Sequence, residues 1–387
     1  MNSAMKWGFR IILMAGLVAV VVGLWKREEI ARLWAVNTLF DEDRIVANFS
    51  NMQRAFLTVP VARGDGPVSP LPEGRQMTLP EGVEDWIASR DLTSLLVLHD
   101  GRIVHESYHK GTGPDDLRIS WSMAKSYLSV LFGILLEEGA ISSIDAPVLR
   151  YAPQLADSAY DGATIRHILQ MTSGVEFDED YLDYDSDINR MGRVLALGGS
   201  MDGFAAGLAA RAGQPGAAWK YVSIDTHVLG MIIRGATGRD IPDVMSEKVI
   251  APLGLETAPY YLSDGNGVAF VLGGLNMRTR DYARFGLMVE QMGAYQGRQV
   301  VHAGWIEDAT TASAPTAQGQ MGYGYQWWIP VGAPKGIFMA RGIYGQYIYI
   351  DQNRDIVIVV TAADRNFRAP GAHAENVTMM RRIADAL

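Results

Sequence analysis

The alternation of apolar and polar residues predicts strands near both ends of the folded part of the chain. Two apolar runs, 95–99 and 102–106, flank Asp100-Gly101, and this dipeptide is typical of the tight turn in a β-hairpin. Further strand-like runs come late in the chain, at 323–329, 337–340, 346–350 and 356–361. Because helical patterns separate these distant runs, we predict an α+β fold with an antiparallel sheet flanked by helices.

The longest helical pattern in this part of the chain predicts a helix at the centre of the molecule. From 122 to 138 most positions are apolar, up to Gly139, so no side of this helix is suited to solvent. Between 140 and 265, short helical patterns alternate with turns rich in Gly, Pro and Asp, which predicts an all-helical subdomain. A last helix is expected over about 373–387.

The N-terminus holds the most apolar segment of the chain. The stretch 7–25 carries one charge, at Arg10, and has a tryptophan at each end, a placement typical of membrane interfaces. No clear small-residue cleavage site follows it. We therefore predict that residues 1–36 form an uncleaved, single-pass transmembrane anchor in the inner membrane, with the rest of the chain on the periplasmic side. A cleaved signal peptide is the alternative.

Residues 37–90 are rich in Pro and Gly and are expected to form a tether that leads into one domain over 91–387.

The charge and residue composition of the chain exclude several classes of function. The 387 residues carry a net charge of −9 without a basic run, so nucleic acid is not an expected partner. The chain has no cysteine and no H-E-x-x-H motif, and we expect neither a metal nor another cofactor.

Candidate chemistry begins at the start of the predicted central helix, where Ser122 and Lys125 form an S-x-x-K motif. A spacing of three places the hydroxyl and the amine on one face of a helix, close enough for proton transfer. Burial favours an uncharged lysine, and only an uncharged amine acts as a base. The motif is not specific by itself, because Ser3 and Lys6 repeat the spacing in the N-terminal tail.

A second candidate is Tyr221, in the triplet Tyr221-Val222-Ser223. A tyrosine that faces the serine is able to carry a proton to a leaving group. The same Tyr-x-Ser pattern occurs at Tyr184 and Tyr261. Aspartates flank Tyr184, and their charges raise the pKa of a phenol, while Tyr261 lacks the Pro-Gly turn that precedes Tyr221. Tyr221 is therefore preferred.

The third candidate element lies at the entry to the last predicted hairpin, around Gly342 and Ile343. Glycine at a strand edge lets a substrate carbonyl approach the backbone closely. The backbone N–H of Ile343 would then join that of Ser122 as an oxyanion hole.

These motifs and their order resemble the serine β-lactamase/DD-peptidase superfamily. The segments 167–174, 273–281 and 323–328 are also similar to that family, and the resemblance covers roughly 90–387. Within the superfamily, the chain most resembles the class C-like branch of esterases and 6-aminohexanoate-dimer hydrolases.

The resemblance implies a serine hydrolase domain over 91–387, with the sheet and helical subdomain of that superfamily. Ser122 would be the nucleophile, Lys125 its base and Tyr221 the proton relay. The backbone N–H groups of Ser122 and Ile343 would form the oxyanion hole. The resemblance also implies substrate contacts at Ser223, Gly342 and Tyr344.

Two positions depart from the family pattern. The second motif more often ends in Asn, and here it ends in Ser223. The third motif commonly has a lysine where this chain has Ala340. Arg341 comes next, but neighbouring strand residues point to opposite faces, so we expect Arg341 to project away from the site. The missing cation disfavours β-lactam substrates, whose carboxylate gains from a charge-assisted contact.

An acidic segment at 176–187 is a further candidate for substrate binding. We predict that Asp183 and Asp187 bind a free amine of the substrate, an interpretation that the family resemblance favours. A solvated loop is one alternative. A calcium loop is another, but its sixth position is Ile188, where such loops need glycine.

We therefore expect a serine hydrolase that cleaves a small ester or linear amide through an acyl-enzyme on Ser122. Two alternatives stay open. One is a penicillin-binding D-alanyl carboxypeptidase or β-lactamase, and the other is a noncatalytic binding module that kept the fold.

Overall fold

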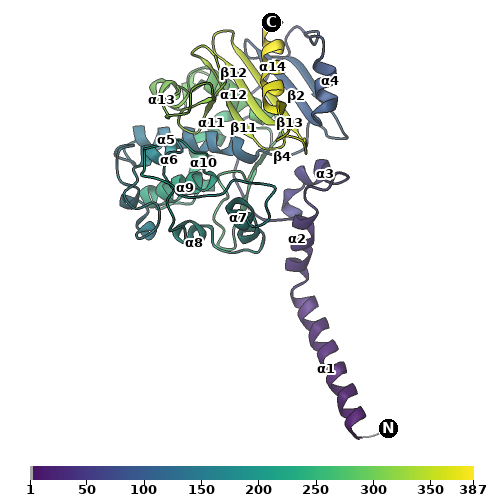
Figure 1. The fold of residues 1–387 in the computed structure, drawn as a ribbon. Helices are drawn as coiled ribbons and strands as arrows, with labels where there is room; N and C mark the ends of the chain where they lie inside the picture. Colours follow the sequence, from purple (N-terminus) through teal and green to yellow (C-terminus); the bar gives the residue numbers. More distant parts are fainter. Residues whose placement is uncertain (1–2) are drawn as a thin grey trace.

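The computed structural model describes residues 3–387 and is built around one large antiparallel sheet (Figure 1). Its strands lie in the order β3-β2-β13-β12-β11-β10-β9. In chain order they are β2 (Leu92–His99), β3 (Arg102–Tyr108), β9 (Gly322–Tyr323), β10 (Trp328–Ile329), β11 (Ile337–Gly342), β12 (Gln346–Asp351) and β13 (Ile356–Ala362). Because β2 pairs with β13, distant parts of the chain meet inside the sheet. The predicted α+β fold is confirmed.

The predicted hairpin at Asp100-Gly101 is also confirmed. His99 of β2 faces Arg102 of β3 across the turn. Asp100 and Gly101 have φ angles of 49° and 69°. A two-residue hairpin turn with both central residues left-handed has the twist that suits its flanking strands, and Asp-Gly is the pair that adopts it most readily.

Helices cover both faces of the large sheet. One face packs against α4 and α14, and the other against α12, with α5 behind it. These helices are α4 (Val83–Ser89), α5 (Ala124–Glu137), α12 (Thr279–Glu290) and α14 (Ala372–Asp385). Along β2, Val97 faces the first pair, while Leu96 and Leu98 face the second. The sheet therefore separates two apolar cores, and α5 lies in the larger one.

The middle of the chain is mainly helical and lies beside α5 (Figure 1). Its helices are α6 (Ile165–Leu169), α7 (Asp187–Ala196), α8 (Met201–Ala206), α9 (Ser223–Thr237), α10 (Ile241–Met245) and α11 (Ala251–Leu253). Helix α9 is central among them, because it packs against α5, α6, α8 and α10.

A second, smaller sheet connects the lead-in segment to the rest of the fold. Its strand order is β1-β5-β6-β4, with β1 (Leu57–Pro60), β4 (Arg118–Ile119), β5 (Tyr260–Ser263) and β6 (Leu275–Met277). Leu57 of β1 pairs with Ser263 of β5, so the segment before residue 90 is part of the folded structure. The remaining short elements are α3 (Ile45–Phe49), β7 (Ala294–Tyr295), β8 (Arg298–Gln299) and α13 (Ala303–Ala309).

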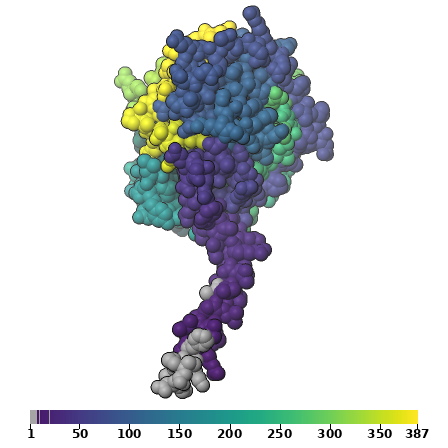
Figure 2. Space-filling view, turned by 90° about the vertical axis from the view of Figure 1, so that its right-hand side faces the viewer, coloured from purple at the N-terminus to yellow at the C-terminus, as the bar shows by residue number. Residues whose placement is uncertain are grey.

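The predicted transmembrane anchor is wrong. The N-terminal segment forms α1 (Ser3–Trp25) and α2 (Arg27–Asn37), and α1 projects from the domain (Figures 1 and 2). Within the part of the chain that the structure describes, no helix combines the length and apolarity of a membrane span. The apolar run 11–25, which follows Arg10, is shorter than the ~20 residues that cross a bilayer. The predicted inner-membrane, periplasm-facing localisation is wrong with it.

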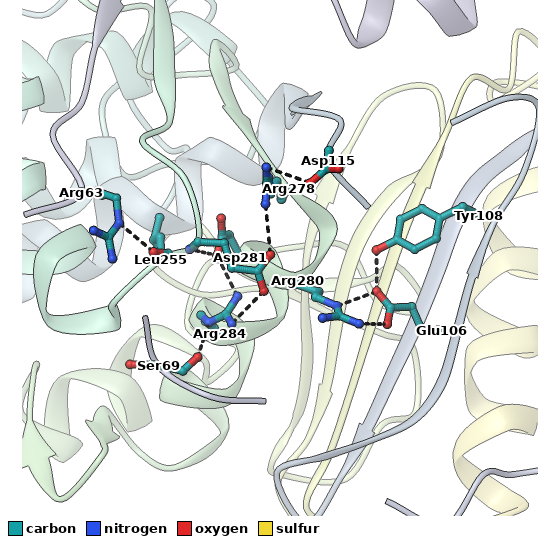
Figure 3. Close-up of polar contacts among 11 residues, drawn as sticks. Arg63, Ser69, Glu106, Tyr108, Asp115, Leu255, Arg278, Arg280, Asp281 and Arg284 are labelled. Atoms are coloured by element: carbon teal, nitrogen blue, oxygen red, sulfur yellow. Dashed lines mark hydrogen bonds and ion pairs between the residues drawn. The ribbon is translucent and has the colours of Figure 1, made fainter. Parts of the chain in front are cut away.

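A network of arginines and carboxylates fixes α12 against its neighbours (Figure 3). Arg284 is buried and forms ion pairs with Asp281 at 2.8 Å and with Glu256 at 2.9 Å. Arg280 holds both carboxylate oxygens of Glu106 on β3, at 2.8 and 2.6 Å. Because a buried charge is costly unless it is paired, the network accounts for the charges at the start of this otherwise apolar helix.

Replacing Arg284 by Met should destabilise the fold, because Asp281 and Glu256 would lose their buried partner. We expect a loss of about 3–5 kcal/mol in denaturant unfolding. The matched control is Lys335→Met, which breaks an exposed pair with Glu307 and should leave stability nearly unchanged. Equal losses in the two variants would contradict the role given to the buried network.

Candidate active site

Ser122 lies on a turn that leads into α5. The turn is the 3₁₀ segment η2 (Trp121–Met123), and α5 begins at Ala124. Trp121 has a φ angle of 42°, a left-handed conformation that is strained for a bulky residue. Strain of this kind persists only where the surrounding structure holds it. Ser122 itself is half-buried and lines a cavity.

Lys125 is buried in the core one turn after Ser122. It is 2% exposed, and its Nζ atom donates to the carbonyl of Leu272 at 2.8 Å. The same atom lies 5.5 Å from the centre of the Tyr221 ring. Burial lowers the pKa of Lys125 to about 7, although the negative charge of Glu179 opposes this shift. The amine is therefore partly uncharged at neutral pH, as a general base must be.

Tyr221 precedes α9 and lies beside Ser122. Its ring stacks on Trp328 with 5.3 Å between the ring centres. Burial and the charge of Glu179 raise the pKa of the phenol, while the nearby Ser122 hydroxyl and the charge of Arg341 lower it. The raised pKa keeps the phenol protonated at neutral pH. Tyr221 is thus suited to donating a proton to a leaving group.

The strand β11 approaches the turn of Ser122 closely at Gly342. A Cβ atom on Gly342 would lie 2.6 Å from the carbonyl oxygen of Ser120 and 3.1 Å from the backbone nitrogen of Ser122. Only glycine fits between these groups. The close approach places Ile343, the next residue, in the lining of the cavity beside Ser122. Their two backbone N–H groups are candidates for an oxyanion hole.

A cluster of four aromatic residues packs around the chain segments that carry Ser122 and Ile343. Tyr344, which follows Ile343, is left-handed like Trp121, with a φ angle of 59°. Phe40 stacks on Tyr344 at 4.9 Å between ring centres and lies 6.0 Å from Trp121. Phe49 packs edge-on against Trp121 and Tyr344, at 5.5 and 5.4 Å. The N-terminal lead-in thus supports the two strained residues that adjoin the candidate N–H groups.

Two cavities meet at Ser122. The first, here named the polar cavity after its charged side chains, has a volume of about 580 Å³ and is lined by charged and aromatic groups, among them Glu179, Tyr221 and Arg341. The second, here named the apolar cavity, has a volume of about 380 Å³ and is lined mostly by apolar side chains. Ser122 and Ile343 line both, so a carbonyl bound at Ser122 is able to send one substituent into each cavity.

Comparison with known proteins decides the family. The profile of the family described as Beta-lactamase matches residues 90–377. This chain belongs to that family. A curated 6-aminohexanoate-dimer hydrolase from Paenarthrobacter ureafaciens is 31% identical over 314 residues, which cover 78% of this chain and 77% of that protein. The predicted resemblance is confirmed, and this β-lactamase-family protein is a serine hydrolase.

Solved structures agree on the fold. A Bacillus anthracis protein, provisionally named a 6-aminohexanoate-dimer hydrolase, superimposes with a TM-score of 0.79 at 24% identity and covers 89% of this chain and 95% of its own. EstCE1, a hydrolase with promiscuous acyltransferase activity, gives a TM-score of 0.58 at 16% identity, with 79% and 96% covered. Both are similar to this β-lactamase-family chain in fold.

Two acidic residues of this site were missed by the sequence analysis. Glu179 accepts hydrogen bonds from the backbone N–H of Ser223, from the Ser223 hydroxyl at 3.2 Å and from Tyr181 at 2.9 Å. Asp225 is buried on α9 and accepts from Tyr160 at 2.9 Å. Burial raises the pKa of both carboxyls, that of Asp225 to about 8. Glu179 belongs to the acidic segment noted in the sequence, but nothing in the sequence distinguishes it there.

Of the other residues predicted to contact the substrate, some line the cavities at Ser122 and some do not. Ser223 and Tyr344 line the apolar cavity, and Gly342 lines the polar one. Asp183 and Asp187 line neither cavity. Asp183 is exposed, and Asp187 forms an ion pair with Arg190 on the next turn of α7 at 2.7 Å. Over residues 3–387, no three or more His, Cys, Asp or Glu side chains group to hold a metal ion.

Arg341 lies in the polar cavity, whereas the sequence predicts that it projects away from the site. The alternation along β11 is as expected, because Ala340 faces the larger core and Arg341 faces the opposite side. There its guanidinium lies over the Trp328 ring, 5.4 Å from the ring centre. The prediction was wrong because the cavity continues past the end of β11 to α14, where His373 also lines it.

Activity should rise with pH around a midpoint near 7, because Lys125 must lose a proton before it can accept one from Ser122. Glu179→Gln should move this midpoint to lower pH, since the charge of Glu179 stabilises the protonated amine. The measurement is kcat/KM for a neutral ester as a function of pH.

The matched control for that profile is Glu176→Gln. Glu176 lies in the same acidic segment but is exposed and lines neither cavity at Ser122. The midpoint of kcat/KM against pH in Glu176→Gln should therefore stay at the wild-type value. A midpoint that does not move in Glu179→Gln, or that moves equally in both variants, would contradict an electrostatic effect of Glu179 on Lys125.

Proposed function

We propose that this protein hydrolyses esters or linear amides through an acyl-enzyme on Ser122. Lys125 takes the proton of the Ser122 hydroxyl while Oγ attacks the substrate carbonyl. The backbone N–H groups of Ser122 and Ile343 stabilise the oxyanion. Tyr221 then protonates the leaving alcohol or amine as its bond to the carbonyl carbon breaks, and regains a proton from Lys125. A water molecule attacks the acyl-enzyme, which releases the acid and restores Ser122.

One observation carries this proposal, namely the environment of the Lys125 amine. A structural lysine keeps its ammonium group in water or pairs it with a carboxylate. Lys125 is buried one turn from Ser122, and its only hydrogen bond to the described residues goes to the neutral carbonyl of Leu272. Such a place disfavours a charged amine but suits a base beside a nucleophile. The same observation argues against a noncatalytic binding module.

Esters and linear amides are supported as substrates by the relatives and by the polar cavity. The curated relative is named for the hydrolysis of 6-aminohexanoate dimer. In this chain Tyr221 and Arg341 line the same cavity, and the leaving group departs on the side of Tyr221. An amide whose leaving part carries a carboxylate would therefore meet the Arg341 cation.

Ser122→Ala should lower kcat by about 10³-fold or more, because the covalent route loses its attacking atom. Lys125→Ala should be comparably harmful, and the double variant should be little worse than either, since the two groups act as one unit. The control is Ser129→Ala on the same helix, whose hydroxyl bonds a backbone carbonyl away from the site.

A fluorophosphonate probe should label the wild type and Ser129→Ala but not Ser122→Ala. Labelling of Ser122→Ala at the wild-type rate would rule out Ser122 as the nucleophile. Absence of labelling in the wild type would favour the noncatalytic alternative.

A penicillin-binding peptidase or β-lactamase is a second candidate, and the position of Arg341 favours it. A β-lactam presents a fixed carboxylate, and Arg341 supplies a cation in the cavity, where the sequence did not predict one. The charge-based reason to expect poor β-lactam turnover therefore no longer holds. A kcat/KM for nitrocefin above that for every short-chain ester would support this candidate.

Arg341→Ala should lower kcat/KM for a carboxylate-bearing linear amide, such as 6-aminohexanoate dimer, about ten- to a hundredfold. This is the fold-change for the loss of one charge-assisted contact of roughly 1.5–3 kcal/mol. Turnover of p-nitrophenyl acetate, which has no carboxylate, should fall much less. The control is Arg365→Ala, which breaks a surface pair with Glu42 and should change neither. Equal losses on both substrates would contradict the carboxylate contact.

A further inference from the structure

The apolar cavity beside Ser122 has walls from three separate parts of the chain. Helix α2 and the turn after it contribute one wall, α7 contributes a second, and the segment before β6 contributes the third. The apolar side chains among them are Val36, Leu39, Phe40, Ile188, Met191, Leu195, Phe270 and Leu272. At about 30 Å³ for each water-sized group, its volume of about 380 Å³ holds roughly a dozen such groups.

We propose that this cavity binds an unbranched apolar acyl chain of medium length, on the order of six to ten carbons. This inference rests on the proposed acyl-enzyme function and names the acyl group that the site takes. The occupant follows from the position of the nucleophile, since Ser122 lines this cavity and the reacting carbonyl must sit beside it. An apolar chain attached to that carbonyl would extend directly between the walls.

The acyl part is assigned to the apolar cavity because the leaving group is expected to lie in the polar cavity. Tyr221, which protonates the leaving group in the proposed mechanism, lines the polar cavity and not the apolar one. Ser122 and Ile343 line both. The carbonyl therefore sits at the junction, with its leaving group towards Tyr221 and its chain towards α7.

Three polar side chains in the walls already have partners within the protein. The Asn189 amide donates to the backbone carbonyls of Tyr181, at 3.1 Å, and Asp183. Arg193 donates to the carbonyl of Tyr184 at 2.6 Å. The Ser223 hydroxyl donates to a carboxylate. Because Asn189, Arg193 and Ser223 make these bonds, the cavity offers a substrate mainly apolar surface.

The first test is the rate on a series of p-nitrophenyl esters from acetate to octanoate. Each buried methylene is worth up to about fourfold in kcat/KM, so we expect a rise on the order of a hundredfold across the series. Alkyl acetates with the same chains on the alcohol should show no such rise. A flat acyl series, or a rise confined to the alkyl acetates, would overturn the acyl assignment.

A pair of substrates with tails of similar length tests the apolar character of the cavity. The p-nitrophenyl ester of hexanoate should be preferred at least about tenfold over that of 6-aminohexanoate, because the ammonium group would lose water without gaining a partner. Equal rates, or a preference for the amino ester, would overturn the inference and favour an amine-binding acyl site.

Gly192 offers a variant that fills the cavity. It lies inside α7 and lines the cavity, and a Cβ atom on it would meet nothing within 4 Å. Gly192→Leu also suits a helix better than glycine does. We expect octanoate turnover to fall at least tenfold, with acetate turnover within about twofold of wild type. The retained acetate activity shows that the variant is folded and its catalytic groups are intact.

The matched control is Gly66→Leu. Gly66 is an exposed glycine that lines neither cavity and likewise has nothing within 4 Å of an added Cβ, so neither substrate should be affected. An octanoate rate that stays at the wild-type level in Gly192→Leu would overturn the assignment of this cavity. Failure of the wild type on every ester and amide would instead contradict the proposed function, on which the inference rests.

Discussion

The arrangement of the whole domain depends on keeping one lysine amine out of water. In the proposed mechanism Lys125 acts as a base only when it is uncharged. It is partly uncharged near neutral pH because α5 lies inside the larger core. The apolar sequence of α5 therefore serves a purpose beyond stability. A surface helix with the same Ser-x-x-Lys spacing would carry a protonated lysine and an unreactive serine.

The second requirement is that distant segments hold the groups around Ser122 in place. Gly342 lets β11 come within contact distance of the turn, and an aromatic cluster supports the strained residues on either side of the two candidate N–H groups. One member of that cluster, Phe40, comes from the N-terminal lead-in and also lines the apolar cavity. The same segment thus contributes to the support of the candidate site and to the shape of the apolar cavity.

Much of the fold and the central motif could be predicted from the sequence because these features are local. The Asp-Gly hairpin and the apolar helix after Ser122 depend on neighbouring residues only. Features that depend on tertiary structure could not be predicted. The direction of Arg341 followed correctly from strand alternation, but its place in the cavity depended on where α14 packs. Likewise, Glu179 differs from the other acidic residues of its segment through tertiary contacts, namely its hydrogen bonds with Ser223 and its place in the cavity lining. The membrane span was wrongly predicted because a short apolar run was extended across a charged residue.

The proposed mechanism requires a covalent intermediate on Ser122, and trapping that intermediate is its most direct test. The wild-type protein would be mixed with p-nitrophenyl octanoate, quenched in acid within the first turnover, and analysed by intact mass and peptide mapping. The proposed mechanism predicts one added octanoyl group, located on the peptide that contains Ser122 and absent from Ser122→Ala. An octanoyl group on another residue, or ester turnover in the absence of any adduct, would contradict it.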